Sequence, residues 1–265
     1  MRHIGLIAGR GKIPALLAEE IKKRGYEITA ITTFKKQKGI LRKYTKDITC
    51  FKINEIQPMI RKLKEKGIKE CVFGGKVEKR VIFETNFSER EKSLLCDLKD
   101  KSDPEIMKLL IHEIESSGIK VVEQGFFLSH LLPKKGVLTK LSPTSNDLQD
   151  IDYGFPLAKK LATLSIGQTI IIREKTVLAV EAIEGTDSTI LRGGRLGKGN
   201  TVAIKVSSEK QDKRFDIPTV GLDTIRTMIK AKTRVLAIEA EEVFVVEKED
   251  VIKLADESGI VIVAV

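Results

Sequence analysis

The chain has 265 residues, of which 42% are hydrophobic and 32% are charged, and its formal net charge is +10. This length allows one large domain or two ordinary ones, and the composition is typical of a soluble globular protein. No apolar run approaches the roughly 20 residues that a membrane-spanning helix needs, and the N-terminus resembles a first strand rather than a signal peptide. We therefore expect a cytoplasmic protein.

Cysteine and histidine are too few and too scattered for thiolate or imidazole metal chemistry. Cys50, Cys71 and Cys96 form no Cys-x-x-Cys pair, so neither a disulfide framework nor a zinc site is indicated. Any bound metal should have oxygen ligands, which favours Mg2+ or Mn2+. The positive charge consists mostly of lysines interleaved with acids, so we expect no nucleic-acid partner, whereas an anionic substrate would suit this charge.

The first half of the chain alternates apolar runs with segments of helical spacing. The last of these segments has Asp103 as its N-cap and Pro104 at its first helical position. Such alternation predicts an α/β domain with a mostly parallel, doubly wound sheet over residues 1–133. The predicted strands are 3–8, 26–33, 47–53, 68–75 and 119–125, and the predicted helices are 15–25, 54–66 and 103–118.

A polar stretch with two prolines and a glycine, PKKGVLTKLSPTSNDLQD, marks a domain boundary. We assign residues 134–150 as the linker and residues 151–265 as the second domain. Closely spaced strands with short turns predict an α+β fold for this domain. Its predicted strands are 167–173, 176–183, 201–206, 234–239, 242–247 and 260–265, and its predicted helices are 152–163, 221–231 and 248–259.

A glycine-rich turn, GLIAGRGKIP, follows the first predicted strand. Gly9 and Gly11 would let backbone N–H groups approach an anion at a helix N-terminus, and they equally suit a merely structural tight turn. A Walker A loop does not fit, because Leu6 stands where its first glycine is required and Ile13 where Ser or Thr is required. A dinucleotide fingerprint is disfavoured because Pro14 replaces its third glycine.

Acidic residues gather at the end of a predicted strand in VLAVEAIEGTDSTI. Glu181 and Ile183 would share one face of a strand, with Ile183 buried, whereas Glu184 and Asp187 arrive where the strand should end. A helix cap at Thr186 and Asp187, or ion pairs with the arginines that follow, would explain part of this acidity. Carboxylates that hold a divalent cation are the alternative.

A second polar stretch, KVSSEKQDKRFDIPTVG, carries both charges ahead of a predicted helix. It contains Lys205, Gln211, Arg214 and Asp216, and Pro218 should hold the backbone before it extended. Arg and Lys clamp phosphate oxygens, and carboxylates hold Mg2+ or orient a water, so this stretch suits phosphoryl chemistry. From its spacing alone, a solvated loop remains the alternative.

Four motifs together resemble one known family. AVEAIEGTD, QDKRFDIPTVG, the opening GLIAGRGKIP and GGKV at 74–77 are similar to the UDP-2,3-diacylglucosamine pyrophosphatases of lipid A biosynthesis, the metal-dependent type unrelated to calcineurin-like phosphoesterases. The similarity covers nearly the whole chain in the same order. It implies a Rossmann-like N-terminal domain, a C-terminal α+β catalytic domain, and Mg2+-dependent hydrolysis of UDP-2,3-diacylglucosamine to UMP and 2,3-diacylglucosamine 1-phosphate.

The resemblance also implies roles for individual residues. Asp216 would be catalytic, as metal ligand or general base, and Asp187 and Glu184 would join it as ligands of Mg2+ (or Mn2+). Ser165 in SIGQ stands where the family often carries an acid, so we assign no chemistry to that motif. The residues that would bind the substrate are Gly9, Gly11, Lys12, Lys76, Lys205, Gln211 and Arg214.

A diacylated substrate implies further partners. The apolar stretch GFFLSHLLP at 125–133 would cradle acyl chains, or else is a plain buried helix. The positive charge would attract an anionic lipid surface, so we expect peripheral contact with the inner membrane, and the family implies a homodimer. The competing hypothesis is a non-catalytic nucleotide-sugar or lipid carrier, in which the same carboxylates only anchor a cation.

Overall fold

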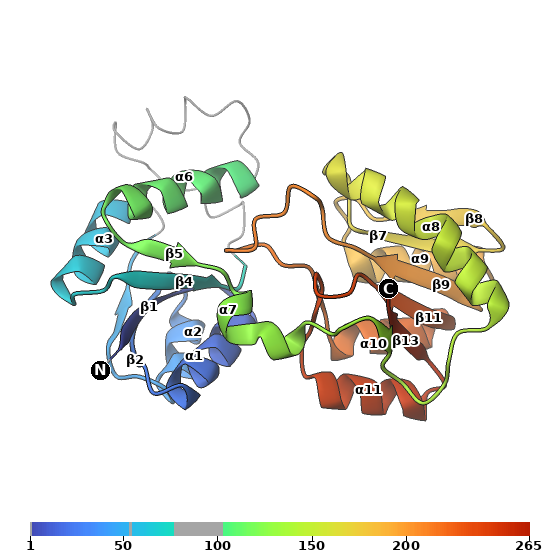
Figure 1. The fold of residues 1–265 in the computed structure, drawn as a ribbon, viewed down its shortest axis with the longest axis horizontal. Helices are drawn as coiled ribbons and strands as arrows, with labels where there is room; N and C mark the ends of the chain where they lie inside the picture. Colours follow the sequence, from blue (N-terminus) through green and yellow to red (C-terminus); the bar gives the residue numbers. More distant parts are fainter. Residues whose placement is uncertain (1, 53–54, 77–102) are drawn as a thin grey trace. The chain divides into compact units, whose positions relative to one another are not determined.

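The computed structural model describes residues 2–52, 55–76 and 103–265, which form two compact units (Figure 1). The first unit comprises Met1–Ser129 together with Asp212–Asp216. The second unit comprises His130–Gln211 and Ile217–Val265. A short segment from the C-terminal half of the sequence therefore belongs to the N-terminal unit.

The first unit is built on a parallel sheet with the strand order β3-β2-β1-β4-β5. The order turns back at β1, as in doubly wound α/β folds, and the predicted parallel sheet is confirmed. Its strands are β1 (His3–Ala8), β2 (Glu27–Thr32), β3 (Ile48–Cys50), β4 (Glu70–Gly74) and β5 (Lys120–Val122). Its helices are α1 (Ile13–Lys23), α2 (Lys35–Leu41), α3 (Ile56–Glu65), α6 (Asp103–Ser116) and α7 (Gly125–Leu128), and the 3-10 turn η1 (Ser129–Leu131) follows in the chain.

Burial explains the elements of the first unit. β1 and β2 are apolar runs buried almost along their whole length, as central strands of a parallel sheet must be. Helices α3 and α6 cover one face of the sheet over a core that includes Leu63, Ile111 and Ile114, and α1 and α2 lie on the other face (Figure 1). Helix α2 was not predicted, because KKQKGIL shows little apolar periodicity.

The stretch 125–133 forms α7 and η1. Phe127 and Leu128 are fully buried, whereas Phe126 is half exposed. The Phe127 ring packs edge-on against Tyr26. The buried-helix alternative thus describes most of this stretch, and the acyl cradle stays a prediction.

The second unit is built on a mixed sheet with the strand order β6-β13-β11-β9-β7-β8. Strands β9, β11 and β13 are parallel, whereas β7 runs antiparallel to β8 and β9, and β6 antiparallel to β13. The strands are β6 (Gly136–Val137), β7 (Thr169–Arg173), β8 (Thr176–Val180), β9 (Thr201–Lys205), β11 (Thr233–Ile238) and β13 (Val261–Ala264), and β10 (Thr219–Val220) pairs separately with β12 (Phe244–Val245). The helices are α8 (Ser145–Thr163), α9 (Thr186–Leu196), α10 (Leu222–Ala231) and α11 (Lys248–Glu257).

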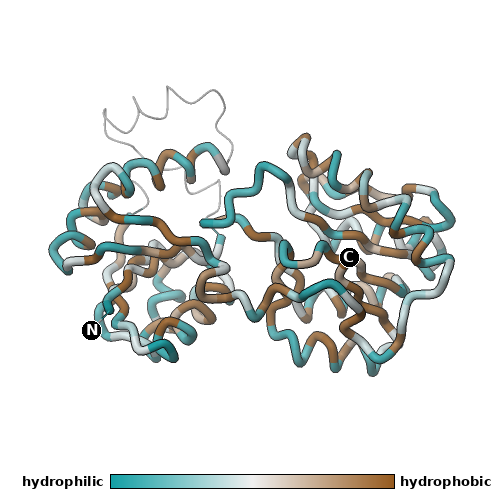
Figure 2. Tube along the Cα trace, viewed as in Figure 1, coloured by the Kyte–Doolittle hydropathy of each residue, from teal (hydrophilic) through white to brown (hydrophobic). Residues whose placement is uncertain are grey.

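Alternate residues of this sheet face two different helical layers. Ile171, Ala203 and Leu236 share a core with residues of α9, α10 and α11. Their strand neighbours Ile170 and Val202 share a core with residues of α8. The helices of both units alternate between hydrophobic and hydrophilic residues, as expected for helices that cover a sheet (Figure 2). None of the described helices is long and apolar enough to cross a membrane.

Helix α8 begins at Ser145 rather than near residue 152. The Thr144 hydroxyl accepts a hydrogen bond from the N–H of Asp147, and the Asp147 carboxylate accepts one from the N–H of Thr144. This reciprocal capping box fixes the helix start. The start therefore lies inside the polar stretch 134–150, and β6 lies there as well.

The chain turns away from the sheet after Val180, earlier than predicted. Ile183 is 99% exposed, so the prediction that it belongs to a buried strand is wrong. Gly185, with φ of +81°, leads into α9, which was not predicted because two glycines interrupt its pattern. At Gly193 only glycine can be accommodated, because a Cβ there would lie 2.5 Å from the Ile171 side chain. Helix α9 thus needs glycine in order to pack closely on the sheet.

Candidate active site

One edge of the sheet in the second unit gathers polar side chains. Thr169 at the start of β7 is paired in register with Lys205 at the end of β9. On the other side of β7, the backbone N–H of Glu181 donates to the carbonyl of Thr169 at 2.8 Å. The three residues therefore form a row across the sheet at the carboxyl end of β9, which is where ligands of open α/β sheets usually bind.

Lys205 is buried in this row and is only 4% exposed. Its Nζ donates to Thr186 Oγ1 at 2.8 Å and to Thr169 Oγ1 at 3.3 Å, and it lies 3.8 Å from Glu181 Oε2. A buried ammonium is tolerated there because hydroxyl and carboxylate partners replace water. Lys205 is thus a fixed positive charge rather than a mobile surface side chain.

Thr186 and Glu181 extend this network to the start of α9. The Thr186 hydroxyl accepts from Lys205 and donates to Glu181 Oε1 at 2.8 Å. Gly185 is the N-cap of α9 and Thr186 is its first residue. The prediction that Thr186 and Asp187 cap the helix is therefore wrong by one residue. The first turn of a helix carries partial positive charge. Lys205 and α9 together create positive potential at this edge, which Glu181 offsets in part.

Gln168 links the network to Gln211. Gln168 Nε2 donates to Gln211 Oε1 at 2.7 Å, and the backbone N–H of Gln168 donates to Glu181 Oε2 at 3.4 Å. Gln211 Oε1 also accepts from the N–H of Ser208 at 3.2 Å. The structure therefore joins two predicted site residues, Lys205 and Gln211, through residues that were not predicted.

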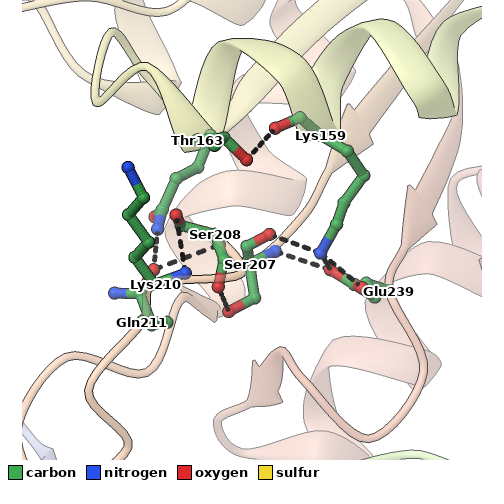
Figure 3. Close-up of polar contacts among 8 residues, drawn as sticks. Lys159, Thr163, Ser207, Ser208, Lys210, Gln211 and Glu239 are labelled. Carbon is green, nitrogen blue, oxygen red and sulfur yellow. Dashed lines mark hydrogen bonds and ion pairs between the residues drawn. The ribbon is translucent and has the colours of Figure 1, made fainter.

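A second set of contacts holds the loop that follows β9. Lys159 of α8 points toward Glu239 and Ser207 (Figure 3): its Nζ lies 2.8 and 3.0 Å from the two Glu239 carboxylate oxygens and 2.7 Å from the Ser207 carbonyl oxygen. Glu239 also accepts from the N–H of Ser207 at 2.8 Å. The loop that carries Gln211 is thus fixed by an ion pair at its start and by Gln168 at its end.

The two predicted metal ligands of the second unit lie at the surface near the start of α9. Asp187 is in the first turn, where a carboxylate complements the helix dipole. Glu184 accepts from Arg192 and from the N–H of Ala182. Hydrogen bonds from its own backbone N–H and from Arg192 lower the pKa of Glu184. The ion pair that the sequence left open as an explanation is therefore observed for Glu184.

Carboxylate oxygens are the right donor type for Mg2+ or Mn2+. Across residues 2–52, 55–76 and 103–265, however, no group of three or more His, Cys, Asp or Glu side chains is gathered to hold a metal ion. Asp216 belongs to the first unit, whereas Glu184 and Asp187 belong to the second. Carboxylates are therefore a suitable donor type, but too few of them lie together in the described residues to form a metal site. A site made of Asp187, Glu184 and Asp216 stays a prediction.

Asp216 ends a compact turn that belongs to the first unit. The N–H groups of Phe215 and Asp216 both donate to the carbonyl of Asp212, at 3.2 and 3.0 Å. Phe215 packs against the hydrophobic core of the first unit. Asp216 itself is exposed. The structure thus presents the predicted catalytic carboxylate on a turn that is seated in the N-terminal unit.

Arg214 braces this turn. Its Nε and Nη2 donate to the Asp212 carboxylate at 2.9 and 2.7 Å, and its Nη1 donates to Glu115 Oε2 of α6 at 3.1 Å. The hydrogen bonds to Asp212 raise the pKa of Arg214. Although burial opposes ionisation of Asp212, Arg214 lowers the pKa of that carboxyl. These contacts use three of the five N–H donors of the guanidinium, and contact of Arg214 with a substrate phosphate stays a prediction.

The glycine-rich turn after β1 is closed against the end of β4. The N–H of Gly9 donates to the carbonyl of Gly74 at 2.7 Å, and Arg10 and Lys76 exchange two backbone hydrogen bonds of 2.8 and 2.9 Å. A Cβ on Gly9 would lie 2.6 Å from the Lys76 carbonyl oxygen, so only glycine fits. The structural alternative therefore explains Gly9, whose N–H donates to backbone rather than to an anion.

Gly11 and Lys12 lie where the chain enters α1. Gly11 has φ of +100°, and a Cβ there would meet no atom within 4 Å. Lys12 is the N-cap of α1 and makes no side-chain cap hydrogen bond. This helix start is open on the Gly11 side and suits an anion. The substrate-binding role of Gly9, Gly11, Lys12 and Lys76 stays a prediction.

The sequence did not identify three residues of this network as site residues, namely Gln168, Glu181 and Thr186. Gln168 lies in SIGQ, to which no chemistry was assigned, and Glu181 was interpreted only as part of a longer strand. The turn REKT at 173–176 contains only a partial signal, because residues at matched distances from a hairpin turn become neighbours and this count places Thr169 beside Val180. A β-bulge between Ile171 and Ile172 shifts the pairing by one residue and brings Thr169 beside Glu181 instead.

Comparison with known families agrees with this arrangement of two α/β units. The LpxI N-terminal domain model matches residues 3–131, and the LpxI C-terminal domain model matches residues 134–263. The two models together span nearly the whole chain, and the protein belongs to the LpxI family. A curated relative from Caulobacter vibrioides, named UDP-2,3-diacylglucosamine pyrophosphatase LpxI, is 29% identical over 278 residues, which cover 100% of this chain and 98% of the relative. The family predicted from the four motifs is confirmed.

Proposed function

We propose that this protein hydrolyses the diphosphate of UDP-2,3-diacylglucosamine to UMP and 2,3-diacylglucosamine 1-phosphate, as an enzyme of lipid A biosynthesis. The support is membership of the LpxI family over nearly the whole chain, together with the name of the Caulobacter relative. The single structural observation that carries the proposal is the buried, hydrogen-bonded Lys205 at the carboxyl edge of the second sheet. Lysine is rarely buried unless its charge is paired, as Lys205 is with Glu181, and ionisable groups held in such networks cluster at functional sites.

The residue roles that we propose follow from charge. Two linked phosphates repel an incoming nucleophile, and fixed positive groups relieve this by stabilising charge on the phosphoryl oxygens in the transition state. Lys205 would supply such a charge without reorganising, since its position is already set by Thr169 and Thr186. Gln211 and Arg214 would steady the diphosphate. Asp216 would orient or deprotonate the water that attacks the sugar-side phosphorus.

Four finer points belong to the same proposal. We propose Mg2+ (or Mn2+) as the cofactor, because carboxylates at Asp187, Glu184 and Asp216 are its usual donor type. The parallel sheet of the first unit would serve as a Rossmann-like nucleotide-binding domain. The net charge of +10 and an acylated substrate favour a cytoplasmic enzyme in peripheral contact with the inner membrane. A homodimer is proposed from the family alone.

The test measures UMP release from the diacylated nucleotide sugar. We expect turnover with Mg2+, its loss with EDTA, and a decrease of at least about 1,000-fold in Asp216→Ala, because general acid–base groups contribute on the order of 10² to 10⁴. Asp223→Ala is the matched control, since Asp223 is another exposed aspartate and pairs only with Arg226 among the contacts described. Tight retention of the substrate without UMP release, under several metals, would establish the carrier alternative instead. Full activity of Asp216→Ala would remove Asp216 from the mechanism.

A further inference from the structure

Gln124 is a buried amide in the first unit that no motif singles out. It lies in the turn between β5 and α7 and is only 3% exposed. A buried amide is costly unless its hydrogen bonds are made. Its partners therefore show what the residue does in this fold.

In the hydrogen bonds described, Gln124 donates to two parts of the unit: the end of β4 and the turn at residues 212–216. Its side-chain Nε2 donates to the carbonyl of Phe73 at the end of β4, at 3.1 Å, and to the carbonyl of Phe215, at 3.4 Å. Its backbone N–H donates to the carbonyl of Lys213 at 3.1 Å. The Phe215 carbonyl belongs to the peptide group that leads directly into Asp216. Gln124 thus ties the backbone on which Asp216 stands to the carboxyl edge of the parallel sheet.

The other attachment of this turn is nearer the solvent. Arg214 pairs with Glu115 of α6, whose side chain is 40% exposed. Exposed ion pairs contribute little to rigidity because water and salt screen them. Phe215 adds apolar contact with the core, which resists withdrawal of the turn but does not fix the direction of its peptide groups. Among the contacts described between this turn and the rest of the unit, the buried amide is the one best placed to orient its peptide groups.

We propose that Gln124 is a positioning residue for Asp216, which holds the catalytic carboxylate in its working direction through the Lys213 and Phe215 carbonyls. This inference rests on the proposed function, because it assumes that Asp216 acts in the reaction. A misplacement of about 1 Å in a catalytic group can cost on the order of 10²-fold in rate. Since Asp216 would act on the transition state rather than in holding the substrate, the loss should fall on kcat and not on KM.

Gln124→Met, which keeps the length of the side chain but removes the donor, tests this inference in the full-length protein. We expect kcat for UMP release to fall about 10- to 100-fold while KM changes less than about threefold. Gln57→Met is the matched control, because Gln57 Nε2 makes a comparable hydrogen bond to Glu113 Oε2 at 2.9 Å in the same unit. This control should keep kcat within about twofold of the parent protein.

A second readout does not depend on activity. Trypsin cuts after Lys213 and Arg214 only when the turn opens, so Gln124→Met should be nicked there at least about tenfold faster than the parent protein or Gln57→Met. Unchanged kcat with unchanged nicking in a folded Gln124→Met protein would overturn the proposal. So would an equal loss of kcat in Gln57→Met, which would show a general loss of stability.

Two further outcomes are distinguishable. If the parent protein releases no UMP, the proposed function fails and takes the positioning role with it, and the nicking rate then reports only on the attachment of the turn. If Gln124→Met does not fold, Gln124→Asn replaces it, since this change shortens the side chain by one methylene and withdraws the amide from the Phe73 and Phe215 carbonyls while keeping a polar group. Faster nicking after Lys213 together with a selective fall in kcat would support the proposal in that variant, and parental values of both would contradict it.

Discussion

The carboxyl edges of the two sheets are built in opposite ways. In the first unit, the segments that follow β1 and β4 pair backbone to backbone through Gly9, Arg10 and Lys76. In the second unit, side chains occupy the corresponding edge, with Lys205 at the centre of a network of hydroxyl, carboxylate and amide groups. Backbone pairing uses the N–H groups of Gly9, Arg10 and Lys76 within the edge, whereas a buried side-chain network holds charge in a fixed place. The comparison teaches that the two sheets, one parallel and one mixed, stabilise their carboxyl edges by different means.

Removal of the Lys205 charge should have the largest effect. Lys205→Met leaves Glu181 as a nearly buried carboxylate without its cation, and breaking such a pair typically costs about 3–5 kcal/mol. We expect the free energy of unfolding, measured by urea titration at pH 7, to fall by about 4 kcal/mol. UMP release should fall in parallel by at least about 100-fold.

The double variant Lys205→Met/Glu181→Gln separates the two effects. Removing both charges avoids an uncompensated carboxylate, so most of the lost stability should return while activity does not. Recovery of activity together with stability would mean that Lys205 serves the fold alone. The second edge would then resemble the first.

A methyl group in the backbone-paired edge should have the next largest effect. Gly75 has φ of +86°, and a Cβ there would lie 2.3 Å from the Arg10 carbonyl oxygen. Gly75→Ala should therefore destabilise the protein by about 3 kcal/mol, measured as the unfolding free energy. Gly11→Ala is the matched control, since it has a similarly positive φ but open space, and it should cost about 1 kcal/mol. Equal costs for the two variants would show that strain, not close backbone approach, governs this edge.

The smallest effect is expected for a change in the capping box of α8, which lies away from both carboxyl edges. Although burial opposes ionisation of Asp147, hydrogen bonds from Thr144 and Arg234 lower its pKa below the usual value near 3.9. Ionised Asp147 therefore stabilises the fold above about pH 4, and this contribution is lost as the pH falls through the lowered folded pKa. Asp147→Asn should cost about 1 kcal/mol at pH 7 and progressively less below about pH 4.

The measurement for Asp147 is the midpoint of urea unfolding across pH 2.5–7, a range chosen around the usual carboxyl pKa of about 3.9. Asp152→Asn serves as its control, because Asp152 is exposed on the same helix. A pH-independent difference between Asp147→Asn and the parent protein would contradict the assignment of this carboxylate.

Hydrophobic periodicity predicted most strands because these strands are buried, and burial leaves a direct trace in the sequence. The misses have specific causes. The start of α8 depends on the capping box of Thr144 and Asp147, which was taken for a polar boundary stretch. Helix α9 contains Gly193 and Gly194, which lower helix propensity but permit close packing on Ile171 of the sheet and on Ala231 of α10, respectively. Tertiary packing overrode local propensity in that case.

The candidate site was predictable only in part, for a related reason. Lys205 and Gln211 could be singled out because their motifs are distinctive. The neighbours that fix them, Glu181 and Gln168, could not be placed by counting from the hairpin turn, because a β-bulge between Ile171 and Ile172 shifts the register of β8 against β7. The seating of the Asp216 turn in the first unit depends on Phe215, a lone apolar residue in a charged loop. A single side chain of this kind does not reveal which distant core it joins.

The route of the chain has a consequence for how the protein can be divided. Because residues 212–216 complete the first unit, a fragment that stops at the apparent domain border near residue 133 would lack a piece of its own interior. Phe215 would leave an apolar hollow in that fragment, and Gln124 would lose two carbonyl acceptors. The two halves of the sequence are therefore unsuited to separate expression, because the first half needs residues 212–216 to complete its unit.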